Sequence, residues 1–276
     1  MHTEVCAQRM GLETPPDETP IWRYMDLPKF VSMLATGALW FTKAATYEDP
    51  YEGFCKAVPS ADHCHAGVVK EERLSPEEMT SELGSLIAAN AADVCRNARD
   101  YLYVNSWCLE PESMAMWEIY GSRGCGVAVK SSVGQHRRAA KFTQRADQYA
   151  FRRVKYHHDL ASSPEIQRDF KSGPIPVGSG LWPEVLNLGF HKRSCYWYEK
   201  EWRAALYQEG RPDQPEIRGV AIAFDLEQLI SAVYLGPRAE DFFCDAVWSI
   251  MDKFLPGKLL ERSTLLSPLR ATVSAA

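Results

Sequence analysis

The chain lacks the sequence features that mark several common classes of protein. Its eight cysteines are scattered with no Cys-x-x-Cys pair, and no apolar run is long enough to cross a membrane. A Gly-rich phosphate loop, a Gly-x-Ser-x-Gly elbow and a His-Glu-x-x-His helix are all missing. These absences argue against membrane proteins, common nucleotide hydrolases, serine hydrolases and zinc proteases. Scattered cysteines without an apolar signal segment predict a cytoplasmic protein with free thiols.

Basic residues are too few to make the whole chain a polycation. The chain has 31 Lys and Arg against 36 Asp and Glu, so its formal net charge is -5 and its overall charge does not favour nucleic acid. Basic side chains nevertheless gather between residues 137 and 155. They are Arg137, Arg138, Lys141, Arg145, Arg152, Arg153 and Lys155. This basic cluster is a candidate site for nucleic acid or phosphate, and a solvated helix face explains it equally well.

Potential zinc ligands occur close together, but their spacing is wrong for a zinc site. They are Cys55, His63, Cys64 and His65. Adjacent Cys and His residues cannot easily turn toward one tetrahedral centre, and no second pair has the spacing of a zinc finger. We therefore expect no bound metal.

The chain does have enough apolar sequence for a large core, with 276 residues of which 46% are hydrophobic. Short apolar runs predict strands, and capped or periodic stretches predict a few helices between them. Strands are expected at 21–25, 38–42, 102–109, 126–130, 149–156, 219–224 and 230–235, and helices at 27–36, 114–120 and 241–254. This mixture predicts an α+β fold with a mixed or antiparallel central sheet and flanking helices.

The ends of the chain and one internal block differ in composition from the rest. Residues 1–20 are polar and Pro-rich, which predicts a flexible leader, and residues 269–276 predict a frayed tail. Residues 74–102 begin with a Ser cap followed by Pro and two Glu, which predicts a helical insert. We expect a single α+β domain over residues 21–268 that carries this insert.

Residues 198–203, Tyr-Glu-Lys-Glu-Trp-Arg, place two carboxylates two residues apart next to basic and aromatic side chains. An apolar run follows at once, which predicts a strand. Residues i and i+2 of a strand share a face, so Glu199, Glu201 and Arg203 are expected to point the same way. Such a face is either a solvated edge or an anionic pocket.

Other polar residues are candidates for binding. Arg23 precedes Tyr24 on the first predicted strand, where a guanidinium can clamp a phosphate or carboxylate, and the alternative is an ordinary ion pair. The loop from Asp49 to Glu52 either presents an acid to a pocket or is a plain turn whose Asp caps its own backbone.

Hydroxyl and aromatic side chains are close in sequence around the middle of the chain. Ser106 and Trp107 are adjacent, and Trp117 and Tyr120 follow. Stacking rings with a hydroxyl donor suit a planar ligand such as nicotinamide or adenine. The alternative is that both tryptophans belong to the core.

These motifs, taken as a set, resemble the pattern of a bacterial family known as the domain of unknown function 2971. They are Trp22-Arg23-Tyr24, Leu39-Trp40-Phe41, Glu48-Asp49-Pro50-Tyr51-Glu52, Ser106-Trp107, Met116-Trp117, Tyr120-Gly121, Gly126-Val127-Ala128 and Tyr198-Glu199-Lys200-Glu201-Trp202-Arg203. The resemblance runs from about Ile21 to Pro268 and implies no established reaction.

The order of three polar residues is also similar to that of the ADP-ribosyltransferase fold. Members of that fold commonly use an Arg or His on an early strand, a Ser, Thr or Tyr on a middle strand and a Glu on a late strand. Arg23, Ser106 and Glu201 occupy these places, while the Ser-Thr-Ser strand motif of the fold is absent. The resemblance implies an enzyme that consumes NAD, of a kind that suits a toxin or an anti-phage defence effector.

The resemblance also implies roles for individual residues. Glu201 would stabilise the positive charge that grows as the glycosidic bond breaks, and Glu199 would orient or deprotonate the acceptor. Arg23 would hold a phosphate or ribose, and the acceptor would be nucleic acid or a protein side chain. The implied NAD-binding residues are Arg23, Tyr24, Ser106, Trp107, Trp117 and Tyr120.

Two other functions remain open at this point. In the first, the chain is a non-catalytic binding or sensor module of a defence system, and its paired acids and bases are a structural ion network. In the second, it is a nucleic-acid enzyme that uses no NAD and whose acids hold a metal.

Overall fold

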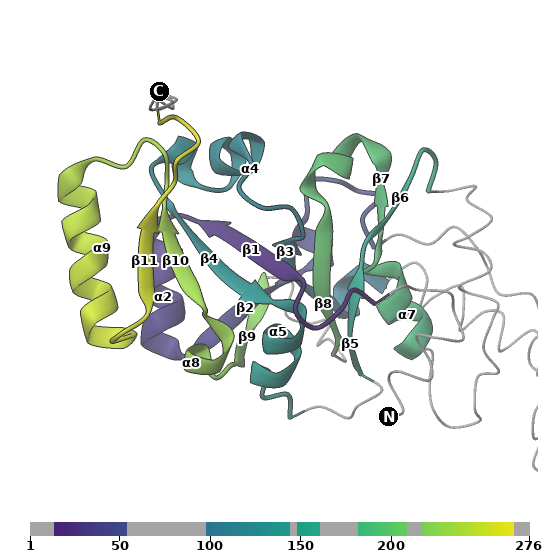
Figure 1. Cartoon of the computed structure of the whole chain (residues 1–276). Helices are drawn as coiled ribbons and strands as arrows, with labels where there is room; N and C mark the ends of the chain where they lie inside the picture. The colour runs from purple at the N-terminus through teal and green to yellow at the C-terminus, as the bar shows by residue number, and fades with distance from the viewer. Residues whose placement is uncertain (1–13, 54–97, 144–147, 161–181, 209–216, 268–276) are drawn as a thin grey trace, which may run out of the picture. The chain divides into compact units, whose positions relative to one another are not determined.

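The computed structural model describes residues 14–53, 98–143, 148–160, 182–208 and 217–267 (Figure 1). Its backbone divides into two compact units. The first unit comprises Thr14 and the described residues of 40–106 and 142–222, and the second comprises those of 15–39, 107–141 and 223–276. The predicted tail, most of the predicted leader and residues 74–97 of the predicted insert lie outside the described residues.

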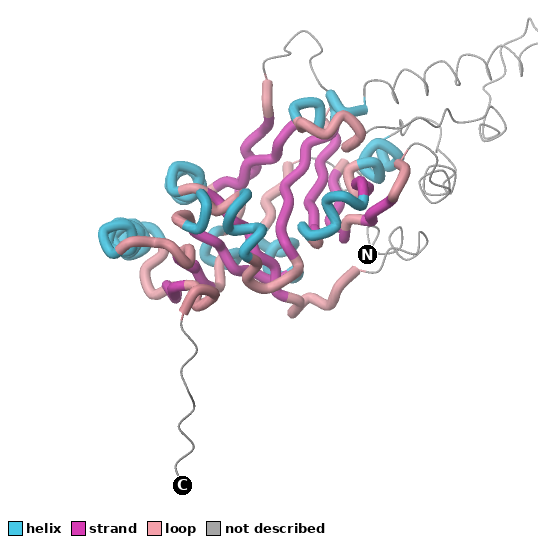
Figure 2. The backbone as a smooth tube through the Cα atoms, turned by 90° about the horizontal axis from the view of Figure 1, so that it is seen from above, coloured by secondary structure: helices cyan, strands magenta, loops and turns pink. Residues whose placement is uncertain are grey.

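Both units contain antiparallel strands with helices beside them, which confirms the predicted α+β class (Figure 2). In the second unit the strand order is β11 (Leu259–Arg262), β10 (Ala232–Leu235), β4 (Val127–Ser132) and β1 (Pro20–Met25). The β1–β4 and β4–β10 pairs are antiparallel, and the β10–β11 pair is parallel. Trp22 of β1 also pairs with Cys108.

The second unit contains the helices α2 (Leu27–Thr36), α4 (Met114–Ile119), α5 (Val133–Ala139), α8 (Leu226–Leu229) and α9 (Asp241–Phe254), and the short 3₁₀ helix η3 (Ser122–Gly124). The start and end of α2 follow from its sequence. The Asp26 carboxylate accepts a hydrogen bond from the backbone N–H of Lys29, and Pro28 lies in the first turn. Gly37 ends the helix with φ of 61°, a left-handed conformation that favours glycine.

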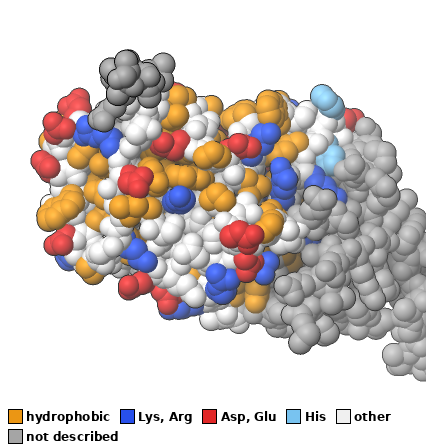
Figure 3. Space-filling model, in the orientation of Figure 1, with side chains coloured by type: hydrophobic (Ala, Val, Ile, Leu, Met, Phe, Trp, Pro, Cys, Tyr) orange, Lys and Arg blue, Asp and Glu red, His pale blue; other side chains and the backbone are white. Residues whose placement is uncertain are grey.

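Large apolar side chains of the second unit reach its surface. Figure 3 shows such side chains in orange among charged ones. They are Ile119, Tyr120, Phe242, Trp248, Phe254, Leu259, Leu265 and Leu266. More than half of an ordinary protein surface is apolar, so we assign no binding site to this exposure alone.

The first unit is built around β8 (Glu201–Tyr207), in which every residue is buried. This strand pairs with β5 (Tyr149–Arg153) and with β3 (Leu102–Cys108), and β3 also pairs with β2 (Ala38–Lys43). The outer neighbour of β2 is β9 (Gly219–Ala223). Strands β2, β3 and β9 also carry residues of the second unit.

A second, small sheet of the first unit pairs β6 (Lys155–His157) with β7 (His191–Arg193) in parallel. The helical elements of this unit are η1 (Ala44–Thr46), α7 (Trp182–Leu188) and the 3₁₀ helix η4 (Ser194–Glu199). The single strand predicted over 149–156 is therefore wrong in extent. It divides at Val154, whose N–H donates to the carbonyl of Glu201, so that β5 and β6 join different sheets.

Candidate functional site

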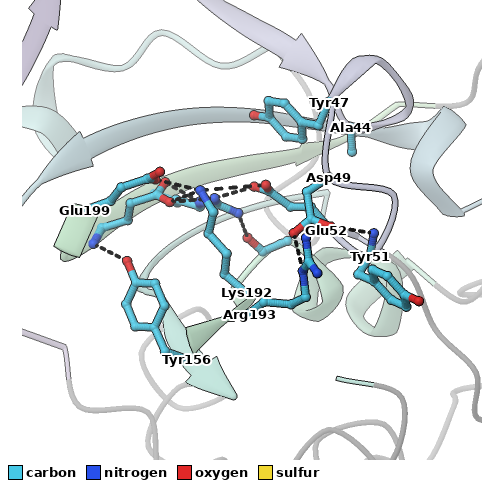
Figure 4. A network of polar contacts seen from close by, with 12 residues as sticks. Ala44, Tyr47, Asp49, Tyr51, Glu52, Tyr156, Lys192, Arg193 and Glu199 are labelled. Carbon is cyan, nitrogen blue, oxygen red and sulfur yellow. Dashed lines mark hydrogen bonds and ion pairs between the residues drawn. The ribbon is translucent and has the colours of Figure 1, made fainter. Parts of the chain in front are cut away.

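Five charged side chains of the first unit are buried together, and we call them the charge cluster (Figure 4). They are Glu52, Lys192, Glu199, Glu201 and Arg203. None of these five residues is more than 6% exposed. Charged residues are rarely buried this deeply unless they are paired, so the contacts within the cluster decide its chemistry.

Glu201 and Arg203 lie at the start of β8 and share one face, as the strand spacing predicts. The Arg203 Nε donates to Glu201 Oε2 at 2.6 Å, and its Nη2 donates to Oε1 at 2.8 Å. This is a two-pronged guanidinium–carboxylate pair, the strongest common form of charge-assisted hydrogen bond.

Glu199 is not on this strand, which corrects the prediction that all three residues share a strand face. It ends the 3₁₀ helix η4, and Lys200 then turns the chain with a left-handed φ of 45°. The two carboxylates nevertheless meet. The Lys192 Nζ donates to Glu199 Oε2 at 2.6 Å and to Glu201 Oε1 at 2.8 Å. A lysine from β7, and not the period of a strand, therefore brings the acids together.

Glu52 comes from the loop after η1 and closes the charge cluster on another side. It accepts a short hydrogen bond from the guanidinium of Arg203, and its other oxygen lies 3.7 Å from the Lys192 Nζ. The remaining guanidinium nitrogen of Arg203 donates to the carbonyl of Gly189 at 2.8 Å. In Figure 4 the side chains of Lys192, Glu52 and Glu199 converge on this network.

The loop that carries Glu52 is the turn of the second alternative, and whether it presents an acid to a pocket stays a prediction. Asp49 caps its own turn, because its carboxylate accepts from the N–H of Tyr51 at 3.0 Å. The same carboxylate pairs with the Arg193 Nε at 3.0 Å. The turn thereby delivers the next acid, Glu52, to the charge cluster.

The side chain of Arg99 fixes this loop by hydrogen bonds to the loop's backbone. Its guanidinium donates to four carbonyl oxygens at 3.0–3.2 Å. They belong to Ala44, Tyr47, Asp49 and Pro50. At Gly53 the backbone φ is 73°, and a Cβ there would lie 3.2 Å from the Leu102 side chain. Glycine therefore suits the point where the loop turns into the core.

The electrostatics of the charge cluster give its two neighbouring acids, Glu199 and Glu201, different pKa values. Burial, together with the adjacent Glu201 carboxylate, raises the pKa of Glu199 to about 7. Burial alone would also raise the pKa of Glu201, but Arg203 and Lys192 hold that pKa well below its usual range. The two carboxyl groups are hydrogen-bonded to each other, so a proton on Glu199 is shared with an ionised Glu201. The charge cluster contains three acids and two bases, so its net charge is zero when Glu199 is protonated.

Tyr156 of β6 borders the same acids. Its hydroxyl oxygen accepts a hydrogen bond from the backbone N–H of Glu201 at 2.9 Å. Burial and the charge of Glu201 raise the pKa of this phenol, so it stays neutral at physiological pH. Sequence reasoning missed Tyr156, Lys192 and Arg99, because no local motif connects them to the Glu-x-Glu stretch.

Most of the predicted NAD-binding residues lie in the second unit. Arg23 and Tyr24 are on β1, and the Tyr24 ring meets the Trp117 ring edge-on at 4.9 Å. Trp107 and Trp117 are 2% and 0% exposed, so both rings are enclosed by protein, whereas Tyr120 is 41% exposed. The core alternative therefore fits both tryptophans, and their contact with a ligand stays a prediction.

Arg23 lies near a buried histidine of the second unit. Burial lowers the pKa of His136 to about 3, and the positive charge of Arg23 adds to this effect. The His136 ring is 5.0 Å from Trp107. Ser106, on β3, belongs to the first unit together with Glu201. The resemblance assigns Arg23, Ser106 and Glu201 to one NAD site, and this assignment stays a prediction.

The basic residues that are close together in the sequence are divided between the two units. Arg137 and Arg138 of α5 pair with Asp17 of the second unit at 3.5 and 2.9 Å. Arg152 is buried in the first unit, where it donates to Asn187 and lies 5.4 Å from the Phe190 ring. Arg145 lies outside the described residues.

Neither a metal centre nor a membrane helix is found in the part of the chain that the structure describes. Within those residues no three His, Cys, Asp or Glu side chains are grouped as metal ligands. The four potential zinc ligands, Cys55, His63, Cys64 and His65, lie outside them. No helix of the described ranges combines the length and the apolar character needed to span a bilayer.

Comparison with known proteins does not place the chain in a family. No protein-family model matches it, so the resemblance to the domain of unknown function 2971 is not shown, and no curated protein matches it either. Solved structures of DarT from Thermus sp. 2.9 do match. The complex with ADP-ribosylated single-stranded DNA covers 91% of this chain and 97% of that chain at 12% identity, with a TM-score of 0.35.

Two further complexes of the same DarT give similar values. The NAD⁺ complex covers 90% of this chain and 98% of that chain at 13% identity, and the carba-NAD⁺ complex covers 90% and 97% at 12% identity, both with a TM-score of 0.35. A likeness this weak carries no argument about activity. We therefore base the functional proposal on the side chains of the charge cluster.

Proposed function

We propose that the protein is an NAD-consuming enzyme of the ADP-ribosyltransferase type, with Glu201 and Glu199 as its catalytic acids. The observation that supports this most is the pair of adjacent carboxyl groups with widely separated pKa values. Environments that push two neighbouring titratable groups apart are typical of sites that divide acid, base and electrostatic roles.

In this proposal Glu201 is the electrostatic group. When the bond between nicotinamide and ribose breaks, its electron pair leaves with nicotinamide and positive charge grows on the ribose. An ionised carboxylate stabilises that charge, and the low pKa of Glu201 keeps it ionised at neutral pH. Its oxygens already accept from Lys192 and Arg203, so a ribose hydroxyl must take the place of one of these hydrogen bonds.

Glu199 is the proton-transfer group in the same scheme. With a pKa of about 7, it is partly ionised at neutral pH and accepts a proton efficiently there. As the acceptor atom bonds to the ribose carbon, its proton passes to Glu199. The acceptor in this proposal is nucleic acid or a protein side chain, and the biological setting is a toxin or an anti-phage defence effector.

The remaining predicted residues supply binding in this proposal. The resemblance implies that Arg23 holds a phosphate or ribose of NAD and that Tyr24, Ser106, Trp107, Trp117 and Tyr120 contact other parts of it, and the proposal takes these roles from the resemblance alone.

The direct test measures nicotinamide release and transfer of label from NAD labelled in its ADP-ribose part. Single-stranded DNA, duplex DNA, RNA and a protein mixture serve as acceptors. Glu201→Gln keeps the size of the side chain but removes its charge, and it should lower the rate about 100-fold or more. Glu110→Gln, an exposed acid of the second unit, is the matched control and should keep the wild-type rate. A chelator in a parallel sample should change nothing, since no step uses a metal.

The proposal fails if the wild type neither releases nicotinamide nor transfers label with any acceptor. It also fails if Glu201→Gln is folded and fully active. Circular dichroism and thermal unfolding establish whether each variant is folded.

A second function is favoured by the burial of the charge cluster. Both oxygens of Glu201 are engaged and every member is almost fully enclosed, as in structural ion networks that fix a conformation. In this case the chain is a binding or sensor module of a defence system. The Glu201→Gln variant would then be less stable, yet its folded form would keep the biological phenotype of the wild type.

A further inference from the structure

One cation touches both members of the carboxyl pair. The Lys192 Nζ donates to Glu199 at 2.6 Å and to Glu201 at 2.8 Å, and it lies 3.7 Å from Glu52. Its ammonium group also lies 4.7 Å from the centre of the Tyr196 ring. Three acids and one aromatic face therefore surround a single buried amine.

The backbone around Lys192 holds this amine in place. Lys192 is the middle residue of β7 and pairs with Tyr156 of the parallel strand β6. Tyr156 in turn accepts from the backbone N–H of Glu201, which ties β6 to the start of β8. The side chain is 7% exposed, so its ammonium cannot exchange these partners for water without leaving the site.

We propose that Lys192 is the positioning residue of this site: its ammonium holds the Glu199 and Glu201 carboxyl groups together and favours the ionised form of each. The inference deepens the proposed function, on which its catalytic meaning rests. Nothing in the Glu-x-Glu motif itself supplies this cation, since Lys200, between the two acids, points its amine to the Trp197 ring at 4.3 Å.

The charges around Lys192 decide the direction of the effect. The groups that face it from the packed elements are Glu52, Tyr196, Tyr198, Glu199, Glu201 and Arg203, with His191 and Arg193 as its neighbours on β7. Burial opposes the charge of Lys192, but the surrounding carboxylates raise its pKa, so it remains an ammonium. The same ammonium favours the ionised form of Glu199, whose pKa therefore depends on it.

The experiment follows the titration of Glu199 directly and needs no NAD. The protein is labelled with ¹³C at its Glu carboxyl groups, and the Glu199 signal is assigned by its loss in Glu199→Gln. The wild-type midpoint is expected near 7. Lys192→Met removes the ammonium with little change in volume and should raise the midpoint by about 1–3 pH units. Lys192→Arg should restore most of the difference.

Lys200→Met is the matched control, because it removes the same charge one residue from each acid without touching the carboxyl pair. Its Glu199 midpoint should stay at the wild-type value. An unchanged or lowered midpoint in Lys192→Met, or an equal shift in both variants, overturns the inference.

Lys192→Met also removes one of the two cations that pair with the buried acids, so the variant can fail to fold. If it does not fold, the double variant Lys192→Met with Glu52→Gln removes one charge of each sign and keeps Glu199 titratable. Its midpoint should still lie above that of Glu52→Gln alone, and equal midpoints overturn the inference.

The activity assay separates this inference from the proposed function. If NAD is consumed, the pH profile of nicotinamide release should move to higher pH in Lys192→Met by the same interval as the titration. If NAD is not consumed but the midpoint moves, the proposed function fails and the positioning role stands. If NAD is consumed and neither the midpoint nor the pH profile moves, the positioning role alone fails.

Discussion

Replacing Glu199 by glutamine should stabilise the protein above neutral pH and change the dependence of its stability on pH. Burial raises the pKa of Glu199 from 4.5 to about 7 in the folded state. Below pH 4.5 the carboxyl group is protonated in both the folded and the unfolded chain, so it contributes no pH dependence there. Between these two values the unfolded chain loses its proton first, and stability therefore falls as the pH rises.

The size of this effect follows from the shift. Each unit of pKa difference corresponds to about 1.4 kcal/mol, so the full shift costs the wild type about 3 kcal/mol once the pH exceeds 7. Glutamine resembles the protonated acid: it cannot ionise, and its amide can donate to Glu201. Glu199→Gln should therefore become more stable, relative to wild type, by about 3 kcal/mol between pH 4.5 and 7.5.

The measurement is urea unfolding followed by tryptophan fluorescence at half-unit steps from pH 4.5 to 8. The difference between the two unfolding free energies cancels the other titrating groups, including Glu201, whose lowered pKa contributes stability that is lost only at acidic pH. Glu110→Gln is the control and should stay parallel to the wild type. If the curve of Glu199→Gln is also parallel to the wild type, or if the gap narrows with rising pH, the electrostatic reasoning about the charge cluster is refuted.

Three further substitutions, two of them with a matched control, test other parts of the structure by urea unfolding. Arg203→Met leaves buried carboxylates without their main partner and should lower the free energy of unfolding by about 3–5 kcal/mol. Arg138→Met, at an exposed ion pair, is its control and should lower it by at most about 1 kcal/mol. Equal losses in the two variants would contradict the buried pairing. Asp26→Ala removes the cap of α2 and should cost about 1 kcal/mol, while Asp26→Asn should recover most of it. Gly37→Ala should cost about 1 kcal/mol through its left-handed φ alone, because no atom lies within 4 Å of the added Cβ, and a neutral result would contradict the strain.

The sequence predicts those parts of the fold that depend on local rules. The cap at Asp26, the proline in the first turn and Gly37 at the end define α2 almost to the residue. The period of two along β8 correctly places Glu201 and Arg203 on one face. In both cases the interactions that define the structure join residues only a few positions apart, so they can be predicted from the sequence.

The errors arise where the backbone departs from the regular period. Lys200 adopts a left-handed conformation that few non-glycine residues take, and nothing in its neighbourhood predicts it. That one residue removes Glu199 from the strand. At Val154 a hydrogen bond to the carbonyl of Glu201 divides one predicted strand into two, and the partner lies far away in sequence.

The partners of the acids were unpredictable for a related reason. Lys192 reaches Glu201 because β7 and β8 are brought together by the fold, and Glu52 meets Arg203 across most of the chain. Single-sequence patterns reveal which face of an element is apolar, but they do not reveal which elements pack together. The candidate acids and Arg203 were therefore found, while Lys192, the other cation that determines their protonation, was not.

The hydrogen bonds from Arg99 to the loop before it have a consequence for the charge cluster. A Cβ on Gly53 would lie only 3.4 Å from the Arg99 side chain, although the two residues are far apart in sequence. The loop that carries Glu52 is therefore fixed by a side chain outside the charge cluster, and the position of one of its acids depends on that distant residue.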